Sequence, residues 1–139
     1  MKKMTDRNSR VLIVDDDVLK LIDIERSLAG CGINRVETAN NQEDAWDIIC
    51  RNAGTVNEID IIVSDMQYPI SGGEDIDVEA GTKLIDRLRD NDISVAVIIC
   101  SSIDYNIPDI AGTVWYSDLR DLDADFRAIL GELWTIKPE

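Results

Sequence analysis

Histidine is absent from this sequence of 139 residues, and its absence excludes several kinds of chemistry. Without an imidazole the chain has no Ser-His-Asp or Cys-His nucleophile, no histidine-ligated zinc site and no phosphohistidine step. Aromatic residues make up only 5% of the chain, and no basic residues interleave with Trp46, Trp115 and Trp134 to form a stacking platform for bases. We therefore expect any chemistry to use carboxylates, hydroxyls and a hard cation.

Basic residues are also scarce. Against 28 Asp and Glu there are 14 Lys and Arg, which gives a formal net charge of -14. A nucleic-acid backbone would be repelled by this charge, so direct nucleic-acid binding is disfavoured. The GxxxxGK[ST], GxGxxG and DxDxT phosphate-binding motifs are missing too, which argues against nucleotide-binding and related enzyme classes.

Cysteines and long apolar runs are few. Cys31, Cys50 and Cys100 are odd in number and far apart, which favours neither a disulfide framework nor a metal site. Cys100 lies in an apolar run and is expected to be a buried small hydrophobe, with redox sensitivity as the alternative. The N-terminal segment lacks the apolar region of a signal peptide, and no run could cross a membrane. These features predict a cytoplasmic protein with no membrane insertion.

The length predicts one domain over residues 1–139, with a flexible N-terminus at 1–9 and no appended output domain. Short apolar runs alternate with segments of helical spacing, which is typical of an α/β fold around a buried parallel sheet. The expected strands cover residues 11–14, 35–39, 59–64, 95–100 and 113–116. A helix is expected after each strand, and the fourth, between residues 104 and 111, is expected to be short or to start at Pro108. Either Asn40 or Asn41 can cap the second helix.

Acidic and hydroxyl side chains follow three of the expected strands. They are Asp15, Asp16 and Asp17 after the first, Asp65 at the end of the third, and Ser101 and Ser102 at the end of the fourth. The carboxyl ends of parallel strands lie at one edge of the sheet, so these groups should converge there. Clustered carboxylates repel one another unless a cation neutralises them, and Mg²⁺ prefers such oxygen ligands. We therefore expect a magnesium site that works on a phosphoryl group, with Asp17 capping the first helix.

The segments VLIVDDD, IIVSDMQYP and VIICSS together resemble the receiver domain of bacterial two-component response regulators. The resemblance spans nearly the whole chain. It implies a flavodoxin-like, doubly wound, five-stranded parallel sheet of (βα)5 type with strand order 2-1-3-4-5. It also implies a sensor histidine kinase or phosphotransfer protein as one partner and an unidentified downstream protein as the other.

The resemblance assigns roles to particular residues. Asp65 corresponds to the phosphoacceptor, and Ser101 to the hydroxyl that hydrogen-bonds the phosphoryl group. Asp15, Asp16, Asp65 and the main-chain carbonyl of Gln67 correspond to the Mg²⁺ ligands, while Ser102 and Pro69 correspond to supporting positions. Such a protein is a phosphoacceptor, with autophosphatase activity as an option, and not a dedicated enzyme. A small Mg²⁺-dependent phosphatase is disfavoured because no general acid is recognisable.

One expected residue is missing. Receivers carry a lysine at the end of the fifth strand, but alignment of TVWYS places Ser117 near that position. A rival register makes LWTIKP the fifth strand and Lys137 the missing residue, but it leaves TVWY unexplained. If the lysine is absent, a degenerate receiver that binds proteins without phosphorylation is the alternative function.

The segment 71–80 is longer than its counterpart in typical receivers and is acidic. Its acids are Glu74, Asp75, Asp77 and Glu79. They could discourage kinase docking, select a basic partner or bind a second cation, but the composition favours a solvated, flexible loop.

Overall fold

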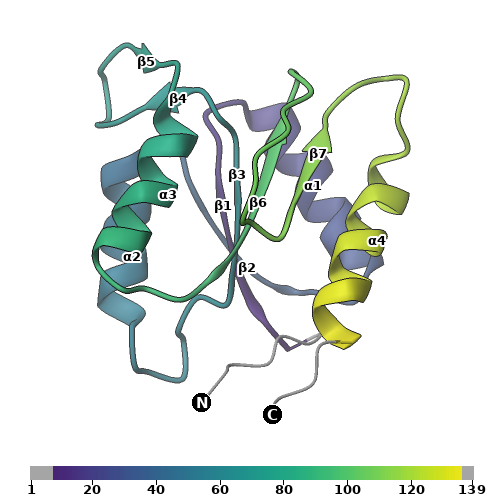
Figure 1. The fold of residues 1–139 in the computed structure, drawn as a ribbon, viewed down its shortest axis with the longest axis horizontal. Coiled ribbons are helices and arrows are strands. Elements are labelled where there is room, and N and C mark those ends of the chain that lie inside the picture. Colours follow the sequence, from purple (N-terminus) through teal and green to yellow (C-terminus); the bar gives the residue numbers. More distant parts are fainter. Residues whose placement is uncertain (1–7, 136–139) are drawn as a thin grey trace.

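A computed structural model describes residues 8–135 of the chain (Figure 1). Within this range five parallel strands form one sheet in the order β2-β1-β3-β6-β7, which confirms the predicted order 2-1-3-4-5. The strands are β1 (Arg10–Val14), β2 (Arg35–Ala39), β3 (Ile61–Ser64), β6 (Ala96–Ser101) and β7 (Gly112–Trp115). Their carboxyl ends lie at one edge of the sheet, as a ligand site in this architecture requires.

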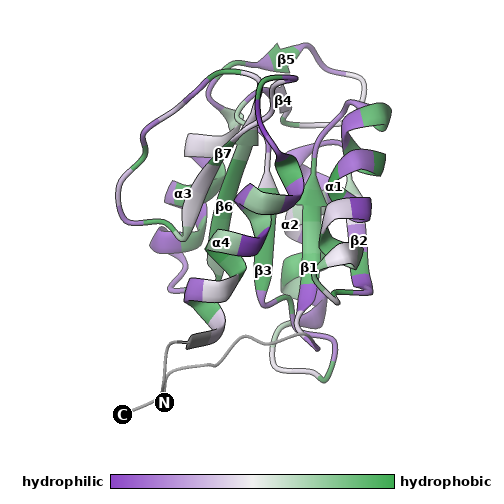
Figure 2. Ribbon diagram, turned by 90° about the vertical axis from the view of Figure 1, so that its right-hand side faces the viewer, coloured by the Kyte–Doolittle hydropathy of each residue, from purple (hydrophilic) through white to green (hydrophobic). Residues whose placement is uncertain are grey.

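Two helices cover each face of the sheet. The helices are α1 (Val18–Gly30), α2 (Gln42–Asn52), α3 (Ala80–Asp90) and α4 (Leu122–Thr135). Alternate residues of β1 face opposite sides: Val11 and Ile13 pack with α1 and α4, and Leu12 and Val14 pack with α2 and α3. Both faces of the central strands are therefore buried, which explains the apolar runs in the sequence (Figure 2). Each such side chain contributes roughly 1.5–3 kcal/mol by leaving water.

Side-chain caps fix the starts of the first two helices. Asp17 accepts hydrogen bonds from the backbone amides of Leu19 and Lys20, as predicted. Of the two candidates for α2, Asn41 is the cap, and its side chain accepts from the backbone amide of Asp44. Because Asp17 caps α1, this helix begins directly after β1.

The expected helix between residues 104 and 111 does not form. The described residues therefore have four helices around the five-stranded sheet, instead of the five expected strand-helix pairs. Ile103, Ile107 and Ile110 have helical spacing, but Pro108 lacks an amide hydrogen and disfavours a helical conformation at Ile107. Asp109 also has a φ of 63°, which a right-handed helix excludes. The connection from β6 to β7 is therefore irregular, and it packs Ile107 and Ile110 partly against the core while Ile103 is exposed.

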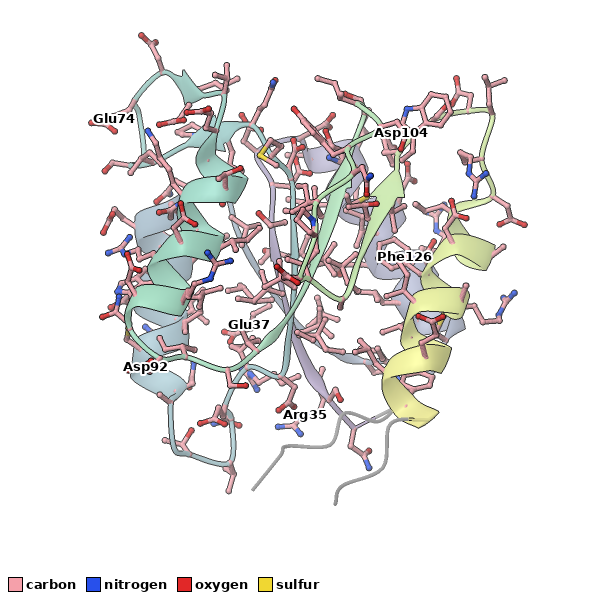
Figure 3. All side chains as sticks on the ribbon, viewed as in Figure 1. Arg35, Glu37, Glu74, Asp92, Asp104 and Phe126 are labelled. Carbon is pink, nitrogen blue, oxygen red and sulfur yellow. The ribbon has the colours of Figure 1, made fainter. Side chains whose placement is uncertain are left out.

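The acidic segment 71–80 is more ordered than the predicted loop. Within it β5 (Ile76–Asp77) pairs antiparallel with β4 (Tyr68–Pro69), so a small two-stranded sheet projects beside the carboxyl ends of the main strands. Figure 3 shows Glu74 on this hairpin at the same end of the molecule as Asp104. We call residues 68–80 the acidic hairpin.

The rival register for the fifth strand is wrong. Residues 112–115 form β7, and Leu133 and Trp134 belong to α4. Lys137 lies outside the described residues, as do residues 1–7 of the expected flexible N-terminus, whereas Ser9 is described and buried. No helix in the described part of the chain is long and apolar enough to cross a membrane.

Candidate functional site

The predicted carboxylates converge at the ends of β1 and β3. These strands are neighbours, and the amide of Asp65 donates to the carbonyl of Val14 at 2.9 Å. One carboxylate oxygen from each of Asp15, Asp16 and Asp65 lies within 4.8 Å of the other two. The structure therefore brings together the three acids that the sequence identified, and we call them the acidic cluster.

The three acids differ in their exposure to solvent. Asp15 is fully buried, the Asp65 side chain is 16% exposed, and Asp16 is exposed. Burial raises the pKa of the Asp15 carboxyl, although the Lys20 ammonium acts in the opposite direction. Asp65 Oδ1 accepts a hydrogen bond from the Met66 amide at 2.7 Å, which leaves Oδ2 as its open oxygen in the described part of the chain. Asp65 is therefore both held in place and accessible.

A lysine that the sequence reasoning missed completes the cluster. Lys20 is 4% exposed, and its ammonium lies 2.9 Å from Asp15 Oδ2 and 3.3 Å from Asp65 Oδ1. It also donates a hydrogen bond of 2.6 Å to the carbonyl of Cys100 at the end of β6. Burial alone would lower the pKa of Lys20, but the charges of Asp15 and Asp65 outweigh it and raise the pKa. One signal was available: Lys20 is one turn before Ile24, on the buried face of α1.

The position after β7 holds a tyrosine. The Tyr116 amide donates to the carbonyl of Ser101 at 2.7 Å, and its phenol donates to the Asp23 carboxylate of α1. The Lys20 ammonium lies 5.5 Å from the centroid of the Tyr116 ring. Ser117, near which the resemblance would place a lysine, instead accepts a hydrogen bond from the Leu119 amide. No lysine follows β7 within the described residues.

Ser101 ends β6 at the same edge of the sheet and is 3% exposed. Its hydroxyl accepts from the Ile103 amide at 3.2 Å, so the hydroxyl hydrogen remains free to be donated. Ser102 is exposed, and its carbonyl accepts from the indole of Trp115. Gln67 is half-buried in the turn after Asp65, and Pro69 belongs to β4 of the acidic hairpin.

The start of α3 packs directly under Asp65. A Cβ on Gly81 would lie 2.8 Å from the Asp65 carbonyl oxygen, and the Gly81 amide donates to the Met66 carbonyl at 2.9 Å. Tyr68 is fully buried beside this contact, and its hydroxyl accepts from Ser64 at 3.2 Å. Burial raises the pKa of Tyr68 to about 12, so it stays neutral there. Only a glycine allows α3 to approach this closely.

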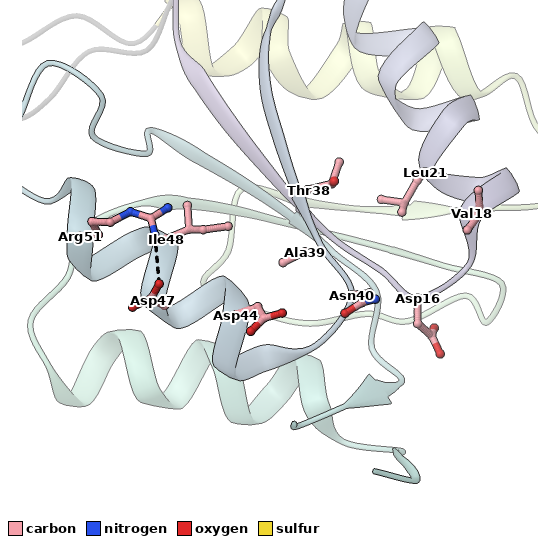
Figure 4. Close-up of a pocket in the computed structure, with 10 residues that line it drawn as sticks. All are labelled: Asp16, Val18, Leu21, Thr38, Ala39, Asn40, Asp44, Asp47, Ile48 and Arg51. Atoms are coloured by element: carbon pink, nitrogen blue, oxygen red, sulfur yellow. Dashed lines mark hydrogen bonds and ion pairs between the residues drawn. The ribbon is translucent and has the colours of Figure 1, made fainter. Parts of the chain in front are cut away.

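A cleft of about 480 Å³ opens between α1 and α2, with Asp16 at one end (Figure 4). At its other end Arg51 pairs with Asp47 at 3.1 Å across one turn of α2. Its lining residues are Asp16, Val18, Leu21, Thr38, Ala39, Asn40, Asp44, Asp47, Ile48 and Arg51. Of the acidic cluster, Asp16 is therefore the member that faces this cleft.

The cluster is compatible with Mg²⁺. Three carboxylates and one ammonium leave two net negative charges, which one divalent cation would balance. Asp15 Oδ2 is buried and accepts no hydrogen bond of good geometry, so its ion pair with Lys20 leaves lone pairs available to a metal. The donor set is entirely oxygen, as this hard cation prefers.

No protein-family model matches the chain. The Two-component response regulator ARR2 of Arabidopsis thaliana is 33% identical over 106 residues, which cover 72% of this chain. A CheY-like receiver domain from Methylobacillus flagellatus has a TM-score of 0.67 at 15% identity, covering 91% of this chain and 98% of that one. The receiver domain of the Francisella response regulator 1452 has a TM-score of 0.65 at 23% identity, covering 91% and 97%. This chain belongs to the receiver domains.

The solved structures establish the receiver fold alone, because their identities are low. The chain spans about 15% of the length of the Arabidopsis relative. This receiver departs from the expected pattern at the end of β7, where Tyr116 and Ser117 follow the strand, and in its acidic hairpin.

Proposed function

We propose that this receiver accepts a phosphoryl group on Asp65 in a Mg²⁺-dependent reaction and then signals through protein contacts. The donor would be a sensor histidine kinase or a phosphotransfer protein. The observation that carries the proposal is the Asp65 carboxylate, which lies beside Asp15 and Asp16 at the carboxyl edge of the sheet and whose Oδ2 accepts no hydrogen bond from the described residues. The charge of -14 disfavours direct binding to nucleic acid as the output.

Asp15, Asp16, Asp65 and the Gln67 carbonyl would hold Mg²⁺, which when bound neutralises charge on the transferring oxygens. Asp65 Oδ2 attacks phosphorus in line, and the bond from phosphorus to the donor's imidazole nitrogen breaks. The electron pair of that bond returns to the nitrogen. The Ser101 hydroxyl then donates its hydrogen to a phosphoryl oxygen.

We expect this hydrogen bond to couple phosphorylation of Asp65 to a change at the surface that partners contact. Ser101 precedes the irregular connection from β6 to β7, and its hydroxyl already binds the amide of Ile103 there. A pull on Ser101 therefore moves the segment 102–111, which is the surface we propose for partner contacts. We place the protein in the cytoplasm, because its three cysteines form no disulfide among the described residues, which fits a reducing environment.

Intact-protein mass spectrometry after incubation with phosphoramidate and Mg²⁺ tests the proposal. We expect a gain of one phosphoryl group, lost in Asp65→Asn and after chelation of Mg²⁺. A gain that persists in Asp65→Asn would refute the assignment of Asp65. No gain in the wild-type chain, either from phosphoramidate or from a phosphorylated kinase, would refute phosphoryl transfer.

A phosphorylation-independent binding module is the second candidate. The observation that favours it is the Lys20 ammonium, which already neutralises part of the acidic cluster without a metal or a phosphoryl group. In that case Mg²⁺ would still raise the melting temperature by binding the folded state, but no phosphodonor would add mass.

A further inference from the structure

We propose that Lys20, which reaches the site from α1, is the phosphoryl-binding cation of this receiver. The inference rests on the proposed function and deepens it, because it assigns a residue to the charge that the end of β7 does not supply. Three observations carry it: the position of the ammonium, the tyrosine that follows β7, and the geometry of Asp65.

Three oxygens from three segments surround the Lys20 ammonium. Lys20 Nζ lies 2.9 Å from Asp15 Oδ2 and 3.3 Å from Asp65 Oδ1, and it donates to the Cys100 carbonyl at 2.6 Å. Of these contacts, the one to the Cys100 carbonyl is a hydrogen bond, whereas the two carboxylates form ion pairs with the ammonium. Lys83, the other lysine in the described range, pairs instead with Asp77 in the acidic hairpin. Only Lys20 brings an ammonium to Asp65 within the described residues.

Tyr116 explains why the lysine comes from a helix. A lysine after β7 would approach the cluster from the side now occupied by the Tyr116 ring, whose centroid is 5.5 Å from Lys20 Nζ. The phenol of Tyr116 donates to Asp23, three residues after Lys20, and so holds α1 against the strand end. The ring also presents its face to the ammonium, which favours a cation there.

The geometry of Asp65 keeps Lys20 close to the carboxylate without blocking the oxygen that would attack phosphorus. Oδ1 accepts the Met66 amide and lies near Lys20, whereas Oδ2 is open to attack phosphorus. With phosphoramidate, the new bond joins Oδ2 to phosphorus, the phosphorus-nitrogen bond breaks, and the nitrogen leaves as ammonia after protonation by water. The phosphoryl group would then lie beside the ammonium, which would bind one of its oxygens, and the Ser101 hydroxyl would bind another. Mg²⁺ held by the acidic cluster would neutralise part of the remaining charge.

The experiment compares four chains: wild type, Lys20→Met, the double variant Lys20→Met with Tyr116→Lys, and the matched control Lys83→Met. The rate of phosphoryl gain from phosphoramidate is followed by intact-protein mass spectrometry at saturating Mg²⁺. We expect Lys20→Met to slow the gain by about tenfold or more, the size of one lost charge-assisted hydrogen bond. Tyr116→Lys should restore much of the rate, and Lys83→Met should equal the wild type.

A second readout does not depend on phosphoryl transfer. Removing the ammonium leaves three carboxylates without a counter-ion, so Lys20→Met should bind Mg²⁺ several-fold more tightly by calorimetry. If Lys20→Met does not fold, Lys20→Gln keeps a hydrogen-bond donor without the charge and takes its place in every comparison.

The outcomes separate the two proposals. A folded Lys20→Met chain that gains phosphoryl groups at the wild-type rate overturns the role of Lys20 and leaves the proposed function standing. If Lys20→Met is slow and Tyr116→Lys does not restore the rate, Lys20 only maintains the structure of the acidic cluster. This outcome also overturns its proposed role in binding the phosphoryl group. A wild-type chain that gains no phosphoryl group overturns the proposed function, and the role of Lys20 with it.

Discussion

Tyr116 donates a hydrogen bond from its phenol to the Asp23 carboxylate, which ties the residue after β7 to α1. The bond keeps the phenol protonated and raises the pKa of Tyr116 to about 12. Because a hydrogen bond to a carboxylate is charge-assisted but this pair is partly exposed, Tyr116→Phe should lower the free energy of unfolding by about 1 kcal/mol at neutral pH.

This contribution should depend on pH in one direction. The unfolded chain loses the Tyr116 proton near its ordinary pKa of 10, and the folded chain loses it near 12. The stabilisation is therefore complete below pH 10 and disappears as the pH rises toward 12. Urea unfolding of wild type and Tyr116→Phe at a series of alkaline pH values measures it. A difference between the two chains that stays constant through this range would contradict the assignment.

Asp15→Asn should stabilise the chain in the absence of metal. Burial raises the pKa of Asp15, so its ionised form is disfavoured in the folded state, and asparagine resembles the neutral form. The Asn side-chain oxygen can still accept from the Asp17 amide, as Asp15 Oδ1 does at 2.9 Å. The gain should be present at neutral pH and vanish below the ordinary Asp pKa of 3.8, where the wild-type carboxyl is also protonated.

Thermal unfolding in a chelator and in excess Mg²⁺ checks this prediction. Asp15→Asn should melt at a higher temperature than wild type in the chelator, and Mg²⁺ should raise its melting temperature less because one ligand charge is lost. A lower melting temperature in the chelator would mean that the ion pair with Lys20 outweighs the cost of burying Asp15.

Gly81→Ala should disturb Asp65, because Gly81 at the start of α3 packs against the Asp65 backbone. Its Cβ would lie 2.8 Å from the Asp65 carbonyl oxygen and 3.0 Å from the Met66 Cα, and backbone atoms move only at a cost. We expect a loss of about 1–3 kcal/mol in the free energy of unfolding, as for overpacking elsewhere. Gly131→Ala is the matched control, because its Cβ meets no atom within 4 Å in helix α4. It should gain about 0.5–1 kcal/mol from helix propensity.

Chemical denaturation of both glycine variants, with the wild type alongside, measures these changes. Equal stability of Gly81→Ala and wild type would show that α3 can move away from Asp65 without cost.

The sequence predicted the parts of the fold that depend on local patterns. Buried runs such as 61–64 mark strands because both of their faces are covered, and Asp65 follows from the end of that strand. The role of Lys20 was not predicted, because its side chain contacts the end of a strand 80 residues away in the sequence and such a contact leaves only a weak local signal. The sequence predicted a short helix at 104–111, restricted by Pro108, but the positive φ of Asp109 has no clear signal in the sequence. The acidic hairpin pairs only two residues per strand, too few for a strand pattern to be visible.

The three thiols should differ in reactivity, which tests the packing of α1 and α4 against the sheet. Cys50 is exposed on α2, Cys31 is half-buried after α1, and Cys100 is fully buried on β6. Burial raises the pKa of the Cys100 thiol to about 12, and the thiolate is the form that reacts. In the native state a disulfide reagent at pH 8 should therefore modify Cys50 first, Cys31 more slowly and Cys100 only on unfolding. Peptide mapping after timed quenching identifies each site, with urea-unfolded protein as the control in which all three react. Rapid native modification of Cys100 would show that the face of the sheet under α1 and α4 opens, and would restore redox sensitivity as a reading of this residue.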